Sequence, residues 1–211
     1  MIKAVVWRAV RVVRQAQGLL CDLPWRIRFR AHGHAPSWSI FTHLTASERL
    51  LLYRLALSLP QPAEILEVGS FIGASACFLA AAASEHNRGV VHCVDTWTNE
   101  AMSEAPRDAF SEFLSNTQQY RAWLIPHRGR SQEVAVAFDR KLDLLFIDGD
   151  HSYKGCKADA ELWLPKLKPG GIVAFHDYGW SHDVQRVVGE LVIPIARQQR
   201  APPNLFVGTL K

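Results

Sequence analysis

The sequence predicts an α/β fold in which a mostly parallel sheet is covered by helices on both faces. Three observations lead to this class. Short apolar runs that read as buried strands alternate with segments of helical character between residues 64 and 190. The first of these runs, 64–68, passes into a glycine-bent turn and then into a helix. Two last apolar runs flank Pro202-Pro203-Asn204, which predicts a chain reversal and an antiparallel end to the sheet.

The elements follow in order along the chain. The first predicted helix runs from about residue 45 to residue 59, where Pro60 and Pro62 stop it. Further helices are expected at 73–84, 106–118, 153–165 and 182–190. Strands are expected at 64–68, 90–95, 122–127, 142–148, 171–176, 191–197 and 204–210. Parallel strands joined by right-handed crossovers bring their carboxyl ends to one edge of the sheet, which is where ligands bind in such folds.

Length and composition favour one globular domain, which we place at 45–211, after a basic, helical extension, 1–44, that could cover a binding site as a lid. Of the 211 residues, 48% are hydrophobic and 21% charged, as in ordinary globular proteins. No uninterrupted apolar run reaches the roughly 18 residues that a membrane span requires. The four cysteines are scattered without a C-x-x-C pair, which favours a reduced, cytoplasmic setting.

Charge is concentrated at the N-terminus. Residues 1–30 hold seven basic side chains and one acidic one, so they carry a net charge of +6, and the rest of the chain carries −2. Arg8, Arg11 and Arg14 lie along one side of a predicted amphipathic helix whose other side is apolar. We expect this helix to pack on its own domain or on a second copy of the chain, with peripheral binding to an anionic membrane as the alternative. Nucleic-acid binding is not expected, because the rest of the chain carries a net negative charge and the basic residues show no clear interleaving with aromatic ones.

The turn after the first strand indicates the kind of cofactor. Gly69 and Gly73 are four residues apart and Ser70 stands where a dinucleotide fingerprint has its second glycine, so the spacing does not match G-x-G-x-x-G. A second strand ends in Asp95, an acidic position suited to the hydroxyls of a ribose. The sequence therefore predicts a nucleoside cofactor that is not a dinucleotide.

The pattern E-x-G-x-x-x-G-x-S at 67–75 resembles motif I of class I S-adenosylmethionine-dependent methyltransferases, with Phe71 at the middle glycine as in the catechol O-methyltransferase-like branch. The stretches L-D-L-L-F-I-D-G-D-H-S-Y at 142–153 and P-K-L-K-P-G-G-I-V-A-F-H-D-Y at 165–178 resemble the fourth and fifth strands of the small type 24 family. The resemblance extends from about residue 45 to residue 211. It implies a Rossmann-like, seven-stranded sheet of order 3-2-1-4-5-7-6 and O-methylation of a small hydroxylated acceptor, such as a sugar or a glycosylated metabolite.

The resemblance also assigns the cofactor contacts. Gly69, Ser70 and Ser75 would hold the methionine end of S-adenosylmethionine, and Asp95 would hold the ribose. Ser131 and Gln132, in a turn similar to the G-x-S-Q turn of catechol O-methyltransferase, would hold the adenine. Trp97 either stacks on the adenine or packs within its own loop. The full expected set is Glu67, Gly69, Ser70, Gly73, Ser75, Asp95, Trp97, Ser131, Gln132 and Asp148.

Asp148, His176 and Asp177 end two neighbouring predicted strands and offer oxygen and imidazole ligands to a divalent cation, magnesium or manganese. The metal-dependent relatives have acidic or amide side chains at these three positions. His176 is a softer ligand, so manganese should suit the site better than magnesium. The alternative is a metal-free site held together by hydrogen bonds.

Methyl transfer to a hydroxyl needs a group that removes its proton. Asp150 is the expected base when a metal is bound, and His151 otherwise, with His176 a further candidate in the metal-free case. Two other classes of protein stay open: an NAD-dependent oxidoreductase, and a cofactor-binding scaffold without catalysis.

Overall fold

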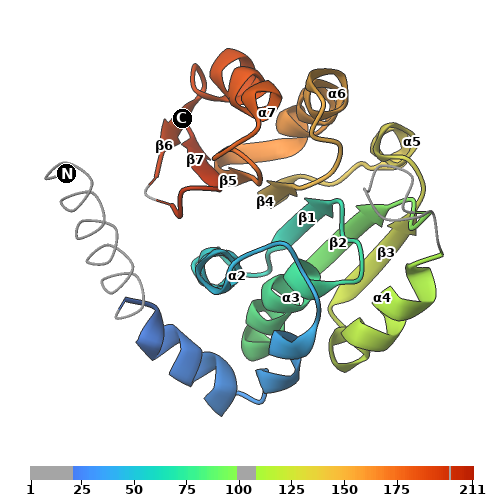
Figure 1. Ribbon diagram of the computed structural model, residues 1–211, viewed down its shortest axis with the longest axis vertical. Coiled ribbons are helices and arrows are strands. Elements are labelled where there is room, and N and C mark those ends of the chain that lie inside the picture. Colours follow the sequence, from blue (N-terminus) through green and yellow to red (C-terminus); the bar gives the residue numbers. More distant parts are fainter. Residues whose placement is uncertain (1–20, 99–107, 200) are drawn as a thin grey trace, which may run out of the picture.

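A computed structural model describes residues 21–98, 108–199 and 201–211, and it has a single seven-stranded sheet (Figure 1). The strand order is β3-β2-β1-β4-β5-β7-β6, which confirms the order that the resemblance implied. Only β7 runs against its neighbours, pairing antiparallel with both β5 and β6. The strands are β1 (Glu64–Val68), β2 (Val90–Asp95), β3 (Leu124–Arg128), β4 (Leu142–Ile147), β5 (Leu167–Phe175), β6 (Ala196–Gln198) and β7 (Phe206–Leu210).

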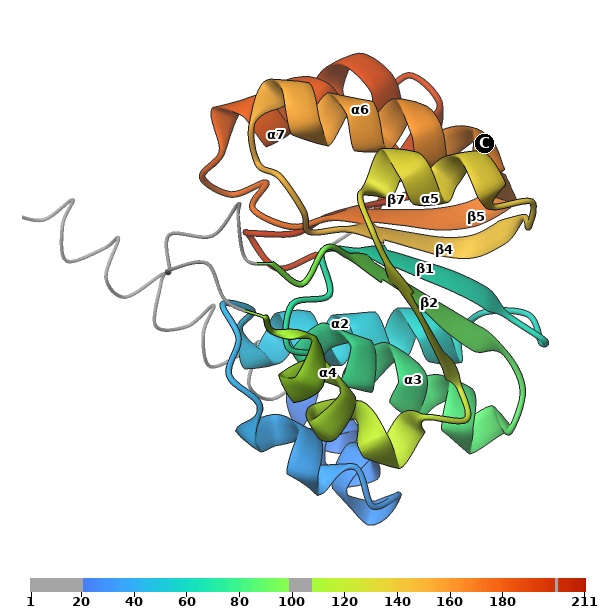
Figure 2. The ribbon, with the colours of Figure 1, turned by 90° about the vertical axis from the view of Figure 1, so that its right-hand side faces the viewer.

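Helices cover both faces of this sheet and create two apolar cores (Figure 2). Helices α2 (Ala46–Leu57), α3 (Ala74–His86) and α4 (Phe110–Thr117) lie on one face. Helices α5 (Ser131–Ala137), α6 (Tyr153–Trp163) and α7 (His182–Val187) lie on the other. Successive strand residues point to opposite faces, so Ile65 joins the first core and Leu66 the second. This double burial explains why the strands read as continuous apolar runs.

The structure differs most clearly from the sequence prediction at α5 and at the segment before β6. Helix α5 was not predicted; its Ala135 is buried, and it covers the sheet beside β2. The strand expected at 191–197 is mostly absent, because residues Val188–Val192 continue α7 as a π-helix with both end residues buried. Pro194 follows, and β6 starts only at Ala196. Val184, Val188 and Val192 are buried at a helical spacing of four residues. This burial outweighs the strand propensity of the β-branched residues around position 192.

The segment before α2 packs against the first helical layer. Residues 21–31 are helical, and the Phe29 ring stacks on Phe78 of α3 with 4.2 Å between centroids. Arg28 Nη2 lies 2.6 Å from the buried Glu85 carboxylate at the end of α3. The predicted amphipathic helix within residues 1–20, and positions 106–107 of the helix predicted before β3, lie outside the described residues. None of the described helices is long and apolar enough to cross a membrane.

Candidate active site

The loops that leave β1, β2, β4 and β5 are joined by backbone hydrogen bonds at one edge of the sheet. The Gly69 N–H donates to Val94 O (2.9 Å), the Asp148 N–H to Val68 O (2.8 Å) and the His176 N–H to Ile147 O (3.0 Å). Three of the four described non-glycine residues with positive φ lie in these loops: Phe71, Trp97 and Asp177. Strained backbone of this kind is typical of functional sites, because it persists only where the surroundings fix it.

The two glycines of the first turn are required by packing. Gly69 has φ +88°, and a Cβ there would lie 2.2 Å from the backbone oxygen of Asp148. Gly73 has φ +91°, and a Cβ there would lie 2.5 Å from Thr117 Cγ2 of α4. Glycine therefore allows the β1 loop to touch the β4 loop and allows α3 to approach α4.

Glu67 is a buried acid that forms no ion pair within the described part of the chain. Its side chain is 0% exposed, and neither carboxylate oxygen has a hydrogen-bond partner among the described residues. Burial raises the pKa of Glu67 to about 7, although the nearby Ser70 and Ser75 hydroxyls oppose the rise. The Ser70 hydroxyl is likewise buried and without a partner in the described structure. Unsatisfied buried acceptors beside a glycine turn fit a ligand that carries an ammonium group, as S-adenosylmethionine does.

Asp95 organises the loop that follows β2. Its two carboxylate oxygens accept hydrogen bonds from the backbone N–H groups of Phe71 (2.8 Å) and Trp97 (2.7 Å). Burial raises the pKa of Asp95 despite these bonds. Each carboxylate oxygen has a second lone pair, which leaves capacity for the hydroxyls of a ribose.

Trp97 packs inside the protein; of its two expected roles, packing within its loop and stacking on an adenine, the structure shows the first. It is 1% exposed, its indole N–H donates to Phe71 O (2.7 Å), and its ring packs against Phe110 and Phe113. Its ring has almost no surface left for an adenine to stack on. Trp97 instead joins the β1 and β2 loops.

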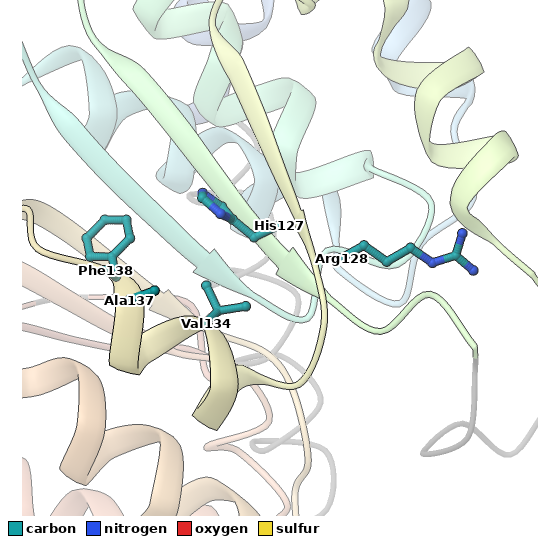
Figure 3. Close-up of a pocket in the computed structure, with 5 residues that line it drawn as sticks. All are labelled: His127, Arg128, Val134, Ala137 and Phe138. Carbon is teal, nitrogen blue, oxygen red and sulfur yellow. The ribbon is translucent and has the colours of Figure 1, made fainter.

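The expected adenine residues begin α5, on the opposite face of the sheet from α3. Ser131 Oγ accepts a hydrogen bond from Trp163 Nε1 (2.7 Å), while Gln132 is exposed on the same turn. A cleft of about 320 Å³ lies between β3 and α5, beside this turn, and is lined by His127, Arg128, Val134, Ala137 and Phe138 (Figure 3). Ser131 is therefore held in place by α6, and Gln132 is the more accessible of the pair.

Asp148, His176 and Asp177 come together beyond the ends of β4 and β5. His176 Nδ1 lies 2.9 Å from Asp148 Oδ1 and 3.3 Å from Asp177 Oδ2. Burial opposes protonation of His176, but the carboxylates of Asp148, Asp177 and Glu48 outweigh it and raise its pKa to about 12. Burial also disfavours ionisation of Asp177, yet hydrogen bonds from His176 and Trp180 hold its pKa well below its ordinary value.

This cluster fits a divalent cation. One ligand atom from each of the three residues lies within 4.8 Å of the other two. Adjacent ligands of an octahedral ion with bonds of about 2.1 Å are separated by about 3 Å, close to the distances from His176 Nδ1 to the two carboxylates. Two carboxylates and one imidazole form a donor set that manganese and other transition ions accept more readily than magnesium.

Sequence reasoning missed two members of the cluster. Glu48 of α2 is 1% exposed, and its Oε2 lies 3.7 Å from His176 Nε2. Asn204, in the loop before β7, places Nδ2 3.1 Å from His176 Nε2 and 3.2 Å from Asp177 Oδ1. The only local signal for Glu48 is its place as the fourth residue of a capping box that starts with Thr45. Nothing in the sequence connects that helix start with β5.

The two candidate bases point in different directions. Asp150 Oδ1 accepts a hydrogen bond from the Ser152 N–H (2.8 Å), and its carboxylate lies over Gly155 in the first turn of α6. His151 instead places Nε2 3.0 Å from Asp177 Oδ2, and its side chain is 41% exposed. The geometry thus brings His151 to the cluster, whereas Asp150 lies against the start of α6, which Ser152 caps.

The fold and this site define the class of protein. A sheet of order 3-2-1-4-5-7-6 with an antiparallel seventh strand, and a glycine turn after its first strand, is the methyltransferase fold. Residues 66–178, more than half of the chain, match the family model described as a methyltransferase domain, type 24. The chain therefore belongs to this family of S-adenosylmethionine-dependent methyltransferases.

The chain is also similar to individual proteins, and the solved structures among them share its fold. The uncharacterized protein y4gI of Sinorhizobium fredii is 33% identical over 120 residues, which are 56% of this chain but only 13% of y4gI. The SAH-bound methyltransferase PaMTH1 of Podospora anserina has a TM-score of 0.65 at 14% identity, and the match covers 97% of this chain and 95% of PaMTH1. CalS11, a TDP-rhamnose 3′-O-methyltransferase, has a TM-score of 0.62 at 19% identity, with coverage of 92% of this chain and 85% of that one.

Proposed function

We propose that this chain transfers the methyl group of S-adenosylmethionine to a hydroxyl of a small acceptor, a sugar or a glycosylated metabolite, with the help of a divalent cation. The observation that carries the proposal is the convergence of Asp148, His176, Asp177 and His151 at the sheet edge that also holds the cofactor turn. The names of the structurally similar NovP and CalS11, both O-methyltransferases, support the choice of oxygen as acceptor atom.

Each group then has a role in the reaction. When bound, S-adenosylmethionine supplies the methyl group, and a cation held by Asp148, His176 and Asp177 supplies a Lewis acid for the acceptor hydroxyl. His151 takes the proton of that hydroxyl as the oxygen–methyl bond forms and the sulfur–methyl bond breaks. Asp177 orients the imidazole through His151 Nε2, which leaves Nδ1 as the nitrogen that accepts the proton.

The direct test is transfer of labelled methyl from S-adenosylmethionine to a panel of hydroxylated acceptors, including TDP-rhamnose, simple glycosides and catechol. We expect at least one to be methylated, with one methyl added per acceptor and one S-adenosylhomocysteine released. Thermal denaturation with S-adenosylmethionine and with NAD separates the classes of protein, because only a ligand that binds the folded state raises the melting temperature. Stabilisation by NAD alone would sink the proposal.

The contact between Asp95 and the ribose predicts a specific loss of cofactor affinity. We expect Asp95→Ala to weaken S-adenosylhomocysteine binding by about 1–3 kcal/mol in calorimetry, because a charge-assisted hydrogen bond is lost. Asp95 also holds the Phe71 and Trp97 backbone, so the same variant should be titrated with the 2′-deoxy analogue as a control. An equal loss for both ligands would reject the ribose contact and leave only a loop effect.

Metal removal should be visible in the wild-type protein. We expect EDTA to suppress methyl transfer strongly while cofactor affinity stays within about twofold, since the cation acts mainly on the acceptor. Manganese should restore activity at least as well as magnesium, because His176 is an imidazole ligand. Full activity in EDTA on an accepted substrate would rule out the metal-assisted mechanism.

A further inference from the structure

Two side chains from different elements face the same ring nitrogen of His176 and make opposite demands on it. Glu48 Oε2, from α2, lies 3.7 Å from His176 Nε2, and this carboxylate can only accept a hydrogen. Asn204 Nδ2, from the loop before β7, lies 3.1 Å from the same nitrogen. The Gly179 N–H donates to Asn204 Oδ1 (3.2 Å), which fixes the amide so that its NH₂ group faces His176.

A ring nitrogen must lose its proton before it can coordinate a cation, so the imidazole of His176 keeps only one proton when a cation is bound. The two neighbours favour different nitrogens for that one proton. Donation from Asn204 Nδ2 requires a lone pair on Nε2, so the ring proton then sits on Nδ1. Glu48 favours a proton on Nε2, which leaves the lone pair on Nδ1. Only the second tautomer can coordinate a cation through Nδ1, the nitrogen that lies 2.9 Å from Asp148 Oδ1 and 3.3 Å from Asp177 Oδ2.

We propose that Glu48 is a positioning residue that keeps the His176 proton on Nε2 and so makes Nδ1 available to a divalent cation between Asp148 and Asp177. The inference rests on the proposed function, since it concerns the same metal site. Glu48 is well placed for the role, because it is 1% exposed and its Oε2 also accepts the Thr45 N–H (2.6 Å) at the start of α2. Carboxylates that hold the second nitrogen of a metal-binding histidine commonly fix its tautomer.

The test is Mn²⁺ affinity, measured from the electron paramagnetic resonance signal of the free ion. We expect Glu48→Ala to weaken Mn²⁺ binding by about tenfold to hundredfold, the usual effect of losing such a partner. Glu48→Gln should lose less, because its amide oxygen still accepts a hydrogen bond. Glu48→Ala in an Asn204→Ala background should regain part of the affinity, since the donor that favours the other tautomer is then gone.

Thr45→Ala is the matched control for a merely structural role. It removes the other half of the same capping box, the Thr45 hydroxyl that accepts the Glu48 N–H, and leaves the Glu48 carboxylate in place. We expect this variant to lower the melting temperature but to keep Mn²⁺ affinity within about twofold, because a lost cap costs helix stability alone. A loss of Mn²⁺ affinity as large as that of Glu48→Ala would overturn the proposal.

The tautomer itself can be observed by ¹⁵N NMR of histidine-labelled protein, with His176 assigned by its absence in His176→Gln. In the Zn²⁺-loaded wild type we expect the one remaining ring proton on Nε2, and in Glu48→Ala at the same Zn²⁺ concentration we expect a ring that still carries its Nδ1 proton. The same tautomer in both, Mn²⁺ affinity of Glu48→Ala within twofold of wild type, or no regain in the double variant would each refute the role of Glu48. A wild type that binds no Mn²⁺ and is fully active in EDTA would instead defeat the metal-assisted function, and the Glu48 proposal with it.

Discussion

Replacing Asp177 by Asn should lower kcat about 10²–10³-fold while S-adenosylmethionine affinity stays within about twofold. The carboxylate of Asp177 contacts both the proposed base and a proposed metal ligand. Its Oδ2 lies 3.0 Å from Nε2 of His151, the base, and 3.3 Å from Nδ1 of His176, the ligand. The variant therefore removes one metal ligand and the group that orients the base. Losing a charged group that acts in the transition state typically costs this much, and it lowers kcat rather than cofactor affinity. Single-turnover methyl transfer and calorimetry measure the two effects separately.

Trp180→Phe provides the control for Asp177. Trp180 Nε1 donates a hydrogen bond to Asp177 Oδ1 (2.6 Å), so its loss disturbs the position of the carboxylate but keeps its charge and its Oδ2 contacts. We expect a decrease in kcat of at most about tenfold, in line with one neutral donor lost from a partly exposed site. Asp177→Asn with a kcat within about threefold of wild type would show that Asp177 has no part in the chemistry.

Replacing Gly69 by Val should unfold the domain or destabilise it by more than about 4 kcal/mol. Single substitutions cost this much through only a few mechanisms, and backbone strain and overpacking are among them. The cause is the 2.2 Å approach of a Cβ to Asp148 O, combined with φ +88°. Backbone atoms of two paired loops cannot move apart without breaking the Asp148 N–H bond to Val68 O. Chemical denaturation measures the free energy of unfolding if the variant folds, and circular dichroism shows whether it does.

Gly170→Ala separates conformational strain from steric conflict. Gly170 also has positive φ, +74°, but no atom lies within 4 Å of a Cβ built there. Its substitution should therefore cost only the left-handed backbone, about 1–2 kcal/mol. Similar losses in the free energy of unfolding at Gly69 and Gly170 would mean that small shifts relieve the contact with Asp148. The turn would then require glycine only because of its positive φ.

The sequence alone determined the sheet and the edge at which the site lies. Alternating apolar strands and helices imply parallel connections, and the reversal at Pro202-Pro203-Asn204 implies the antiparallel end, because these features are local and repeat along the chain. The same topology sends Asp95, Asp148 and His176 to one edge, since each ends its strand or directly follows it. These residues could be assigned to a cofactor and metal site, and that assignment stays a prediction for experiment.

Only the tertiary structure decided which partners those residues have. Glu48 and Asn204 reach His176 from a helix and a loop that no local pattern links to β5, so their contacts depend on how α2 and the β6–β7 connection pack on the sheet. The burial of Trp97 and the turning of Asp150 toward α6 were likewise settled by packing, which a side chain's sequence neighbours do not specify. Parallel connections follow from the alternation of strands and helices, and the strand order followed from the family resemblance. Side-chain contacts between layers depend on the close packing of the whole domain.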